Sequence, residues 1–270
     1  MTGMAPSDDL PIDCVDSGAG PVLLFLPGSY STPAAWRSVQ RLLKPNWRML
    51  TTSLCGYGQT AETRTAQDHG MQHELRVVEA LARRAGGPVH LVGHSFGGTV
   101  ALAAALSGRI EVASLALFEA NPMDILHERG ANSLFAQGLR MSQDFEQAVA
   151  GGERDAPGRV IDFWGGPGVF AAMPEAVQAY CRATASANVL DWHTDFGFSV
   201  GASDCARLKL PVLLVRGGLA NPAMVKITEA LGSCLPDVRA EVVEGAGHFL
   251  ITSHARACAD LLSAFLPGQP

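Results

Sequence analysis

Short runs of apolar residues alternate along the chain with longer amphipathic stretches, and Gly or Pro residues separate them. Several of the runs are continuously apolar, as expected of strands that are buried on both faces of a sheet. We predict strands at 12–15, 22–26, 48–53, 88–92, 113–118, 212–216 and 239–243. The amphipathic stretches carry apolar residues three and four positions apart, which predicts helices at 34–43, 72–85, 97–106, 224–235 and 255–266.

The alternation of strand and helix predicts an α/β fold with a mostly parallel, doubly wound sheet. Between 121 and 203 the rhythm changes, because Gly, Met and large aromatic residues become frequent and no strand pattern is evident. We therefore expect a core made of 1–120 and 204–270. We expect 121–203 to be a mainly helical cap, inserted after the strand that ends near Phe118 and lying over the carboxyl ends of the strands.

Composition narrows the class of protein. Hydrophobic residues make up 47% of the 270 and charged residues 17%, so the chain can bury a sizeable core. The net charge is −6, and Lys and Arg are scattered singly, so we expect no nucleic-acid partner. Residues 1–10 contain no apolar run long enough for a signal peptide or a membrane span, so we expect a cytoplasmic protein without a membrane partner. We expect a monomer or a homodimer.

Six cysteines are spread singly, without a CxxC pair or histidines at metal-ligand spacing. We interpret them as small, mostly buried thiols. The chain also lacks a P-loop and a GxGxxG motif after the first strand. We therefore expect no metal and no cofactor, and a small-molecule substrate as the partner.

One motif indicates a catalytic nucleophile. Residues 93–97 read Gly-His-Ser-Phe-Gly between a predicted strand and a predicted helix, the setting in which GxSxG forms a nucleophile elbow. Such a turn strains the serine backbone and packs the helix closely on the strand, so small residues are needed two positions before and after Ser95. The motif also places Ser95 at a helix N-terminus, which favours developing negative charge.

With these residues the chain resembles the α/β-hydrolase superfamily over nearly its whole length apart from the insertion. Leu-Pro-Gly-Ser at 26–29 looks like the oxyanion loop of the family, with Pro27 in place of the usual His. Gly-Ala-Gly-His-Phe at 245–249 looks like the loop that presents the catalytic histidine. The resemblance implies that the backbone N–H groups of Phe96 and Ser29 form an oxyanion hole.

His248 is the predicted general base. It follows a strand, glycines flank it, and it comes after the nucleophile and the acid in chain order, as in this family. A neutral imidazole bonded to Ser95 can take its proton during attack and return it to the leaving group. Seven other histidines lack a matching loop, and we expect His94 to point away from the nucleophile.

The catalytic acid departs from the family pattern. Asn221 stands where an Asp is usual after the penultimate strand, and an amide cannot offset the charge of an imidazolium. Glu119 is the leading candidate, because it ends the strand 113–118 at the point where a subgroup of haloalkane dehalogenases places its catalytic Glu. Dehalogenase chemistry itself is not implied, because those enzymes use an Asp nucleophile. Asp124, or a Ser-His-Asn arrangement with Asn221, stays an alternative.

We therefore predict hydrolysis of an ester, thioester, lactone or related carbonyl bond through an acyl-enzyme. Two alternatives stay open: a cofactor-free lyase, C–C bond hydrolase or perhydrolase on the same site, and a ligand-binding scaffold with little turnover. The aromatic residues of 121–203 indicate either an apolar substrate or only the hydrophobic core of the cap. The candidate pocket residues are Tyr30, Trp36, Trp164 and Trp192.

Overall fold

The computed structural model describes residues 10–267, so the stretches 1–9 and 268–270 lie outside it, together with most of the segment searched for a signal peptide. Its centre is a seven-stranded sheet in the order β1-β3-β2-β4-β5-β6-β7. The strands are β1 (Cys14–Ser17), β2 (Val22–Leu26), β3 (Arg48–Thr52), β4 (Val89–His94), β5 (Val112–Phe118), β6 (Val212–Gly217) and β7 (Val238–Val243). Only the β1–β3 pair of this sheet is antiparallel, which confirms the mostly parallel α/β fold.

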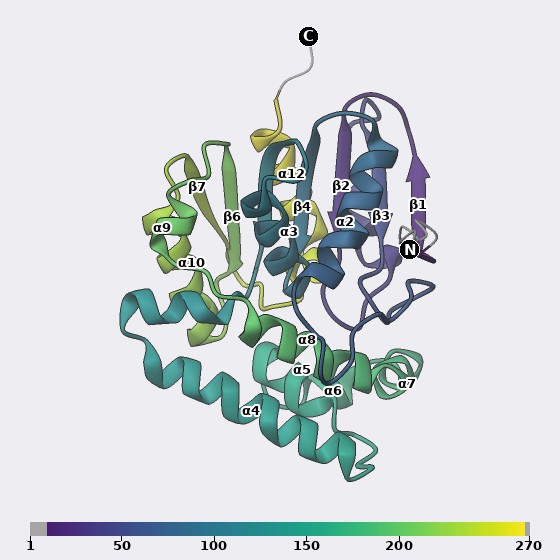
Figure 1. The fold of residues 1–270 in the computed structure, drawn as a ribbon, viewed down its shortest axis with the longest axis vertical. Helices are drawn as coiled ribbons and strands as arrows, with labels where there is room; N and C mark the ends of the chain where they lie inside the picture. The colour runs from purple at the N-terminus through teal and green to yellow at the C-terminus, as the bar shows by residue number, and fades with distance from the viewer. Residues whose placement is uncertain (1–9, 268–270) are drawn as a thin grey trace, which may run out of the picture.

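Helices cover both faces of the sheet (Figure 1). One face carries α2 (Gln72–Ala85), α3 (Phe96–Ser107) and α10 (Pro222–Cys234), and the other carries α1 (Arg37–Gln40), α11 (Leu250–Ser253) and α12 (Ala255–Phe265). Alternate residues of β2 serve the two cores, because Leu24 and Leu26 pack in one and Leu23 and Phe25 in the other. The run of five buried apolar residues in β2 follows from this packing on both faces.

The helix expected over 34–43 is shorter than predicted. The chain forms a 3-10 turn, η1 (Pro33–Trp36), and then α1. Beyond α1 the chain continues as tight turns, because the N–H groups of Leu42 and Leu43 bond three residues back, to the carbonyls of Val39 and Gln40. The apolar spacing of 34–43 predicted one α-helix and did not distinguish it from a series of such turns.

The chain between β5 and β6 is helical. It forms η2 (Met123–Arg129), α4 (Asn132–Ala150), α5 (Gly158–Gly165), α6 (Val169–Ala172), α7 (Glu175–Ala183), α8 (Ala185–Gly197) and α9 (Ala202–Cys205). Figure 1 shows α4 to α8 grouped beyond one end of the sheet, below β4 and β6. The end of β4 that leads into α3 faces this group, so side chains at the carboxyl ends of the strands meet residues of α5 and α8.

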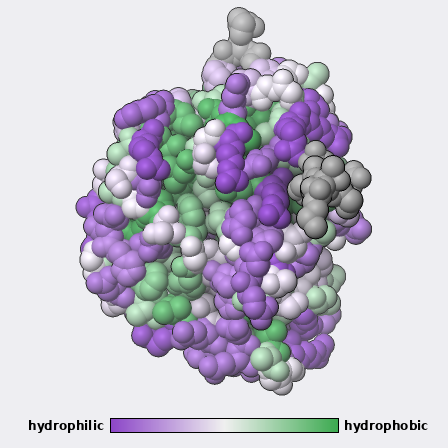
Figure 2. Space-filling model, viewed as in Figure 1, coloured by the Kyte–Doolittle hydropathy of each residue, from purple (hydrophilic) through white to green (hydrophobic). Residues whose placement is uncertain are grey.

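No helix among residues 10–267 is long and apolar enough to cross a membrane. Figure 2 shows hydrophilic residues over much of one face, with apolar residues mainly in its upper and central part.

Candidate active site

Ser95 occupies the sharp turn between β4 and α3. Its φ of 53° and ψ of −129° are a strained conformation for a residue with a side chain. Gly93 allows the turn, since a Cβ there would lie 2.4 Å from the carbonyl oxygen of Gly97. A Cβ on Gly97 would lie 2.2 Å from the carbonyl oxygen of Pro27. The two glycines thus let α3 pack directly on β4 and on the loop after β2.

A chain of hydrogen bonds runs from Ser95 to Glu119. The Nε2 atom of His248 lies 3.0 Å from the Ser95 hydroxyl, and its Nδ1 atom lies 2.8 Å from Glu119 Oε2. The Nδ1–H tautomer satisfies both contacts, because it donates to the carboxylate and leaves Nε2 free to accept the Ser95 proton. The three side chains are buried. This arrangement of nucleophile, base and carboxylate can perform nucleophilic catalysis.

Glu119 is itself held firmly. Its Oε1 accepts a hydrogen bond of 2.7 Å from the backbone N–H of Gly217, at the end of β6, and its backbone N–H donates to the carbonyl of Val215. Its φ is 47°, which turns the chain sharply where β5 ends. The carboxylate therefore faces His248 from the strand next to β4.

The other candidate acids have different partners. Asp124 Oδ2 accepts hydrogen bonds from the Ser199 hydroxyl and from the backbone N–H of Val200. Asn221 caps α10, because its Oδ1 accepts from the N–H of Ala223 at 2.8 Å while its Nδ2 donates to the Phe163 carbonyl. The usual acid position is thus used here to begin a helix, and Nδ1 of His248 bonds to Glu119.

Two backbone amides lie beside Ser95, those of Ser29 and Phe96. Ser29 follows β2, and Phe96 is the first residue of α3, so its amide is one that a helix leaves unpaired. Within residues 10–267 neither amide donates to another group. Gly28 brings the loop close, because a Cβ there would lie 2.9 Å from Cβ of Ser95. The arrangement can hold an oxyanion formed at Ser95.

His94 supports the loop that carries His248. Its ring is buried, and its Nε2–H donates to the backbone carbonyl of His248 at 2.9 Å. Burial, together with the neighbouring His248, lowers the pKa of His94 to about 3. His94 is therefore neutral at physiological pH, and it braces His248 through the backbone of that residue.

A cavity of about 70 Å³ opens at Ser95. Tyr30, Trp164 and Trp192 line it as expected, and the Trp164 ring stacks on His248 with centroids 5.3 Å apart. The expectation for Trp36 is wrong. That side chain is fully buried on the face of the sheet that α1 and α12 cover, where it packs against Phe25 and Phe118.

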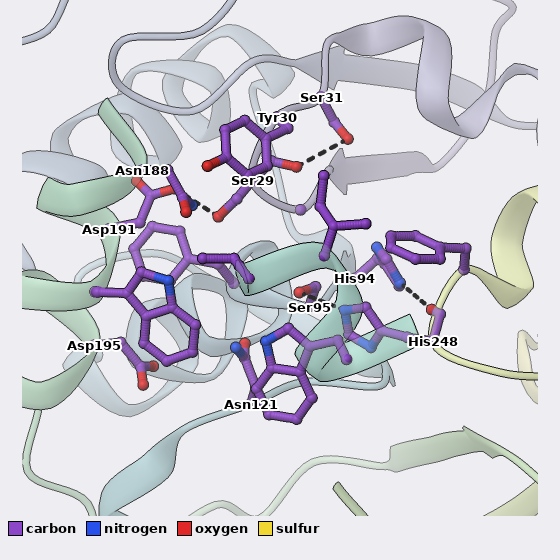
Figure 3. Close-up of a pocket in the computed structure, with 17 residues that line it drawn as sticks. Ser29, Tyr30, Ser31, His94, Ser95, Asn121, Asn188, Asp191, Asp195 and His248 are labelled. Carbon is purple, nitrogen blue, oxygen red and sulfur yellow. Dashed lines mark hydrogen bonds between the residues drawn. The ribbon is translucent and has the colours of Figure 1, made fainter. Parts of the chain in front are cut away.

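The cavity also has polar walls that the sequence analysis missed. Figure 3 shows Asn188, Asp191 and Asp195 on one side of Ser95, and Asn121 beside the nucleophile. Three of these residues recur along α8 at positions 188, 191 and 195, which is one helical face. That spacing was a usable signal, but without a position for α8 it could not be assigned to the site.

An ionic cluster lies behind this wall. Arg64 is fully buried and contacts Glu62, Glu74 and Asp191 at 2.8 to 3.1 Å. Asp191 in turn accepts hydrogen bonds from the Ser29 hydroxyl at 2.5 Å and from Tyr57 at 2.6 Å. Among the described residues no group of three or more His, Cys, Asp or Glu side chains converges as metal ligands. Arg64 lies in a loop without periodicity, so no sequence pattern identified its partners.

Comparison with known proteins identifies a matching family and a related sequence. Residues 23–261 match the model of a family described as "Alpha/beta hydrolase family". The chain is 26% identical to a fluoroacetate dehalogenase from a Burkholderia species, over 96% of this chain and 91% of that protein.

Similar folds occur among solved structures. A bromoperoxidase from Bacillus anthracis superposes with a TM-score of 0.75 at 18% identity, over 96% of both chains. An esterase from Exiguobacterium antarcticum gives a TM-score of 0.73 at 18% identity, again over 96% of both. At this identity the structural likeness establishes the fold.

Proposed function

The chain belongs to the alpha/beta hydrolase family, and on this premise we propose that it is a serine hydrolase that cleaves a carbonyl ester, thioester or lactone of a small substrate through an acyl-enzyme. The observation that carries the proposal is the continuous set of contacts from Ser95 through His248 to Glu119. Hydrolases of this family share a fold, so the choice of reaction has to come from the residues of the site.

In the proposed mechanism, Oγ of Ser95 attacks the substrate carbonyl carbon while Nε2 of His248 takes the hydroxyl proton. The oxyanion that forms accepts hydrogen bonds from the amides of Phe96 and Ser29. The imidazolium of His248 is stabilised by Glu119 and then protonates the leaving oxygen or sulfur as the tetrahedral intermediate collapses. A water activated by His248 releases the acid and restores Ser95.

Dehalogenation is not part of the proposal, although a named relative is a fluoroacetate dehalogenase. If a serine oxygen displaced a halide from carbon, the product would be an ether. An ether has no carbonyl for a second attack by water, so the enzyme would stay alkylated. Ser95 therefore fits acyl transfer, in which the covalent intermediate is an ester that water can cleave.

We further propose that 121–203 acts as a cap that selects the substrate, because α5 and α8 supply Trp164 and Trp192 to the cavity. All six cysteines are free thiols, four of them buried, which fits a reducing compartment such as the cytoplasm. The small-molecule partner and the state of monomer or homodimer stay predictions.

A panel of para-nitrophenyl esters and lactones of increasing acyl length tests the proposed reaction. We expect turnover of short acyl esters by the wild-type chain and its loss in Ser95→Ala and His248→Ala. The variants should keep the far-UV circular dichroism spectrum of the wild type. Equal turnover in Ser95→Ala would contradict the proposal, and a wild-type chain that binds the esters without turnover would favour a ligand-binding scaffold.

A further inference from the structure

One wall of the cavity at Ser95 is polar and comes mainly from a single helix. Asn188, Asp191 and Asp195 of α8 all line the cavity, and each is about 98% buried or more. Apolar residues, Val160 and Ile161 among them, line other parts of the cavity. A substrate in the cavity therefore meets both the hydrogen-bonding groups of α8 and apolar surface.

Both carboxylate oxygens of Asp191 already accept hydrogen bonds from other residues of the protein. Its two carboxylate oxygens accept from Arg64, Tyr57, Ser29 and the side-chain amide of Asn188. This residue therefore fixes the cavity wall and has little capacity left for a ligand. Among the residues that the structure describes, no Lys or Arg lines the cavity, and the guanidinium of Arg64 lies behind Asp191.

Asp195 differs from Asp191. Its Oδ2 accepts a hydrogen bond of 3.3 Å from the backbone N–H of Met123, while its Oδ1 has no hydrogen bond of normal geometry in the described part of the chain, although the Thr99 hydroxyl lies close enough to favour the ionised carboxyl. No cation pairs with it there, and burial raises the pKa of Asp195 well above its usual range. An unpaired buried acceptor costs free energy, so such a group beside a cavity indicates that a ligand supplies its partner.

Asp195 lies close to α3, the helix that follows Ser95. Thr99 lies one helical turn after Ser95 on α3, and its hydroxyl bonds to Asn121 and adjoins the Asp195 carboxyl. Asn188 offers a second acceptor, its Oδ1, which has no partner among residues 10–267 and lies about 10 Å from Asp195 towards the N-terminus of α8, at 1.5 Å per residue. A ligand group that fits both positions is uncharged and can donate a hydrogen bond.

Resting on the proposed serine hydrolase function, we propose that the acyl group of the substrate is uncharged and carries a hydroxyl group, which Asp195 binds. The hydroxyl donates to the free carboxyl oxygen, and it can accept from the protonated carboxyl in return. A substrate whose acyl chain ends in a carboxylate is disfavoured, because its charge would be buried near the Asp191 carboxylate and no Lys or Arg lines the described cavity.

Matched ester pairs test the inference in the wild-type chain. Para-nitrophenyl esters of 2- and 3-hydroxybutanoate are compared with those of 2- and 3-methylbutanoate, in which a methyl group replaces the hydroxyl. Each kcat/KM is divided by the rate constant for alkaline hydrolysis of the same ester, which removes intrinsic reactivity. We expect at least one hydroxy ester to exceed its methyl partner by about tenfold or more, as the satisfaction of a buried acceptor requires. A carboxylate-terminated ester should be slower than an uncharged ester of equal length.

Variants assign the preference to Asp195. In Asp195→Leu the ratio of hydroxy to methyl ester should fall to about one, whereas Asp195→Asn keeps an acceptor and should keep part of the ratio. Asp144→Asn, at an exposed position on α4, is the matched control and should behave as the wild type. If Asp195→Leu does not fold, the ratio of corrected kcat/KM between hydroxy and methyl esters in the wild type tests the inference by itself.

The outcomes separate this inference from the function on which it rests. Equal corrected rates for each pair in the wild type, or an unchanged ratio in folded Asp195→Leu, would overturn the inference and leave the serine hydrolase intact. A wild-type chain that hydrolyses none of the esters and does not react with a fluorophosphonate would overturn the proposed function and the inference together.

Discussion

Three residues other than glycine have a positive φ in the described part of the chain, and all three belong to the site. Tyr30, Ser95 and Glu119 have φ values of 58°, 53° and 47°. Ser95 and Glu119 directly follow strands and Tyr30 lies in the loop after β2; Tyr30 and Ser95 line the cavity, while Glu119 contacts His248. Such conformations cost roughly 1–3 kcal/mol each and persist only where the surrounding structure imposes them. The strain is thus concentrated where attack on a carbonyl is proposed to occur.

At the residue scale, Glu119→Gln tests the acid. The amide keeps the shape of the side chain but cannot offset the imidazolium charge, and it can hold the wrong tautomer of His248. We expect kcat to fall by about 10³–10⁴-fold with little change in KM, because the Asp-to-Asn change in the serine-protease triad has an effect of this size. Steady-state kinetics on a para-nitrophenyl ester measure this. Asp124→Asn is the control and should stay near the wild type, whereas near wild-type turnover in Glu119→Gln would exclude Glu119 as the acid.

His94 gives a pH dependence of stability. Its pKa is about 3 in the folded chain and 6.5 in the reference state, so the unfolded chain binds a proton in this window and the folded chain does not. The stabilisation is therefore complete above pH 6.5 and is lost as the pH falls toward 3. Between pH 7 and 5 the loss is about 2 kcal/mol.

Urea unfolding at pH 7 and pH 5 measures this effect. In His94→Gln, which keeps a side-chain donor for the His248 carbonyl but cannot titrate, the decrease in unfolding free energy between the two pH values should be smaller by about 2 kcal/mol. The same decrease in both proteins would show that His94 does not carry the pH dependence.

Local sequence signals were enough for part of the site. Ser95 and His248 sit in short motifs whose chain neighbours define the turn, so each could be predicted without knowing the fold. Glu119 could be proposed because the end of a strand is a local feature. Asp191 and Asp195 could not, since their place in the cavity depends on how α8 packs against the sheet.

At the scale of elements, the junction of β4 and α3 depends on Gly93. In Gly93→Ala the new methyl group meets the backbone of Gly97 and Gly98 at 2.4 to 2.8 Å, where no flexible side chain can give way. We expect a loss of about 1–3 kcal/mol in the free energy of unfolding, as for other overpacked sites, and a large loss of esterase activity.

Gly87→Ala is the matched control for this variant. A Cβ there has nothing within 4 Å, so stability should stay the same or rise by a few tenths of a kcal/mol. Thermal unfolding with activity assays compares the two variants. A Gly93→Ala protein as stable and active as Gly87→Ala would show that the close packing at the elbow is not needed.

The elements themselves were largely predictable. The predicted strands lie within about two residues of all seven strands of the described sheet, and the buried parallel strands such as β2 were the clearest, because they need continuous apolar sequence. Helix α2 was predicted with its observed bounds from its amphipathic spacing. The segment 34–43 differed from its prediction, because apolar spacing does not distinguish one α-helix from a short helix flanked by 3-10 turns.

At the scale of the whole molecule, Arg64 links distant parts of the chain. Its guanidinium joins Glu62 and Glu74 to Asp191 of α8, and all its charged atoms are out of water. In Arg64→Met, Glu74 and Asp191 would stay buried without their cation, so we expect a loss of about 3–5 kcal/mol in unfolding free energy.

Chemical unfolding compares this variant with Arg109→Met, which removes an exposed ion pair with Glu79. The exposed pair should contribute about 1 kcal/mol or less. Equal effects of the two substitutions would mean that the Arg64 cluster does not hold α8 to the sheet. No sequence pattern indicated this cluster, because it joins three segments that meet only in the folded chain.

The most direct test of the account is where a fluorophosphonate probe attaches. Such probes react with an activated serine and stay bound, so peptide mass spectrometry can locate the adduct. We predict one adduct, on Ser95, formed rapidly by the wild type and at least about a hundredfold more slowly by His248→Ala, which loses the base. Unmodified Ser95 in the wild type, or equal labelling rates in the two proteins, would contradict the proposal that His248 activates Ser95 as the nucleophile.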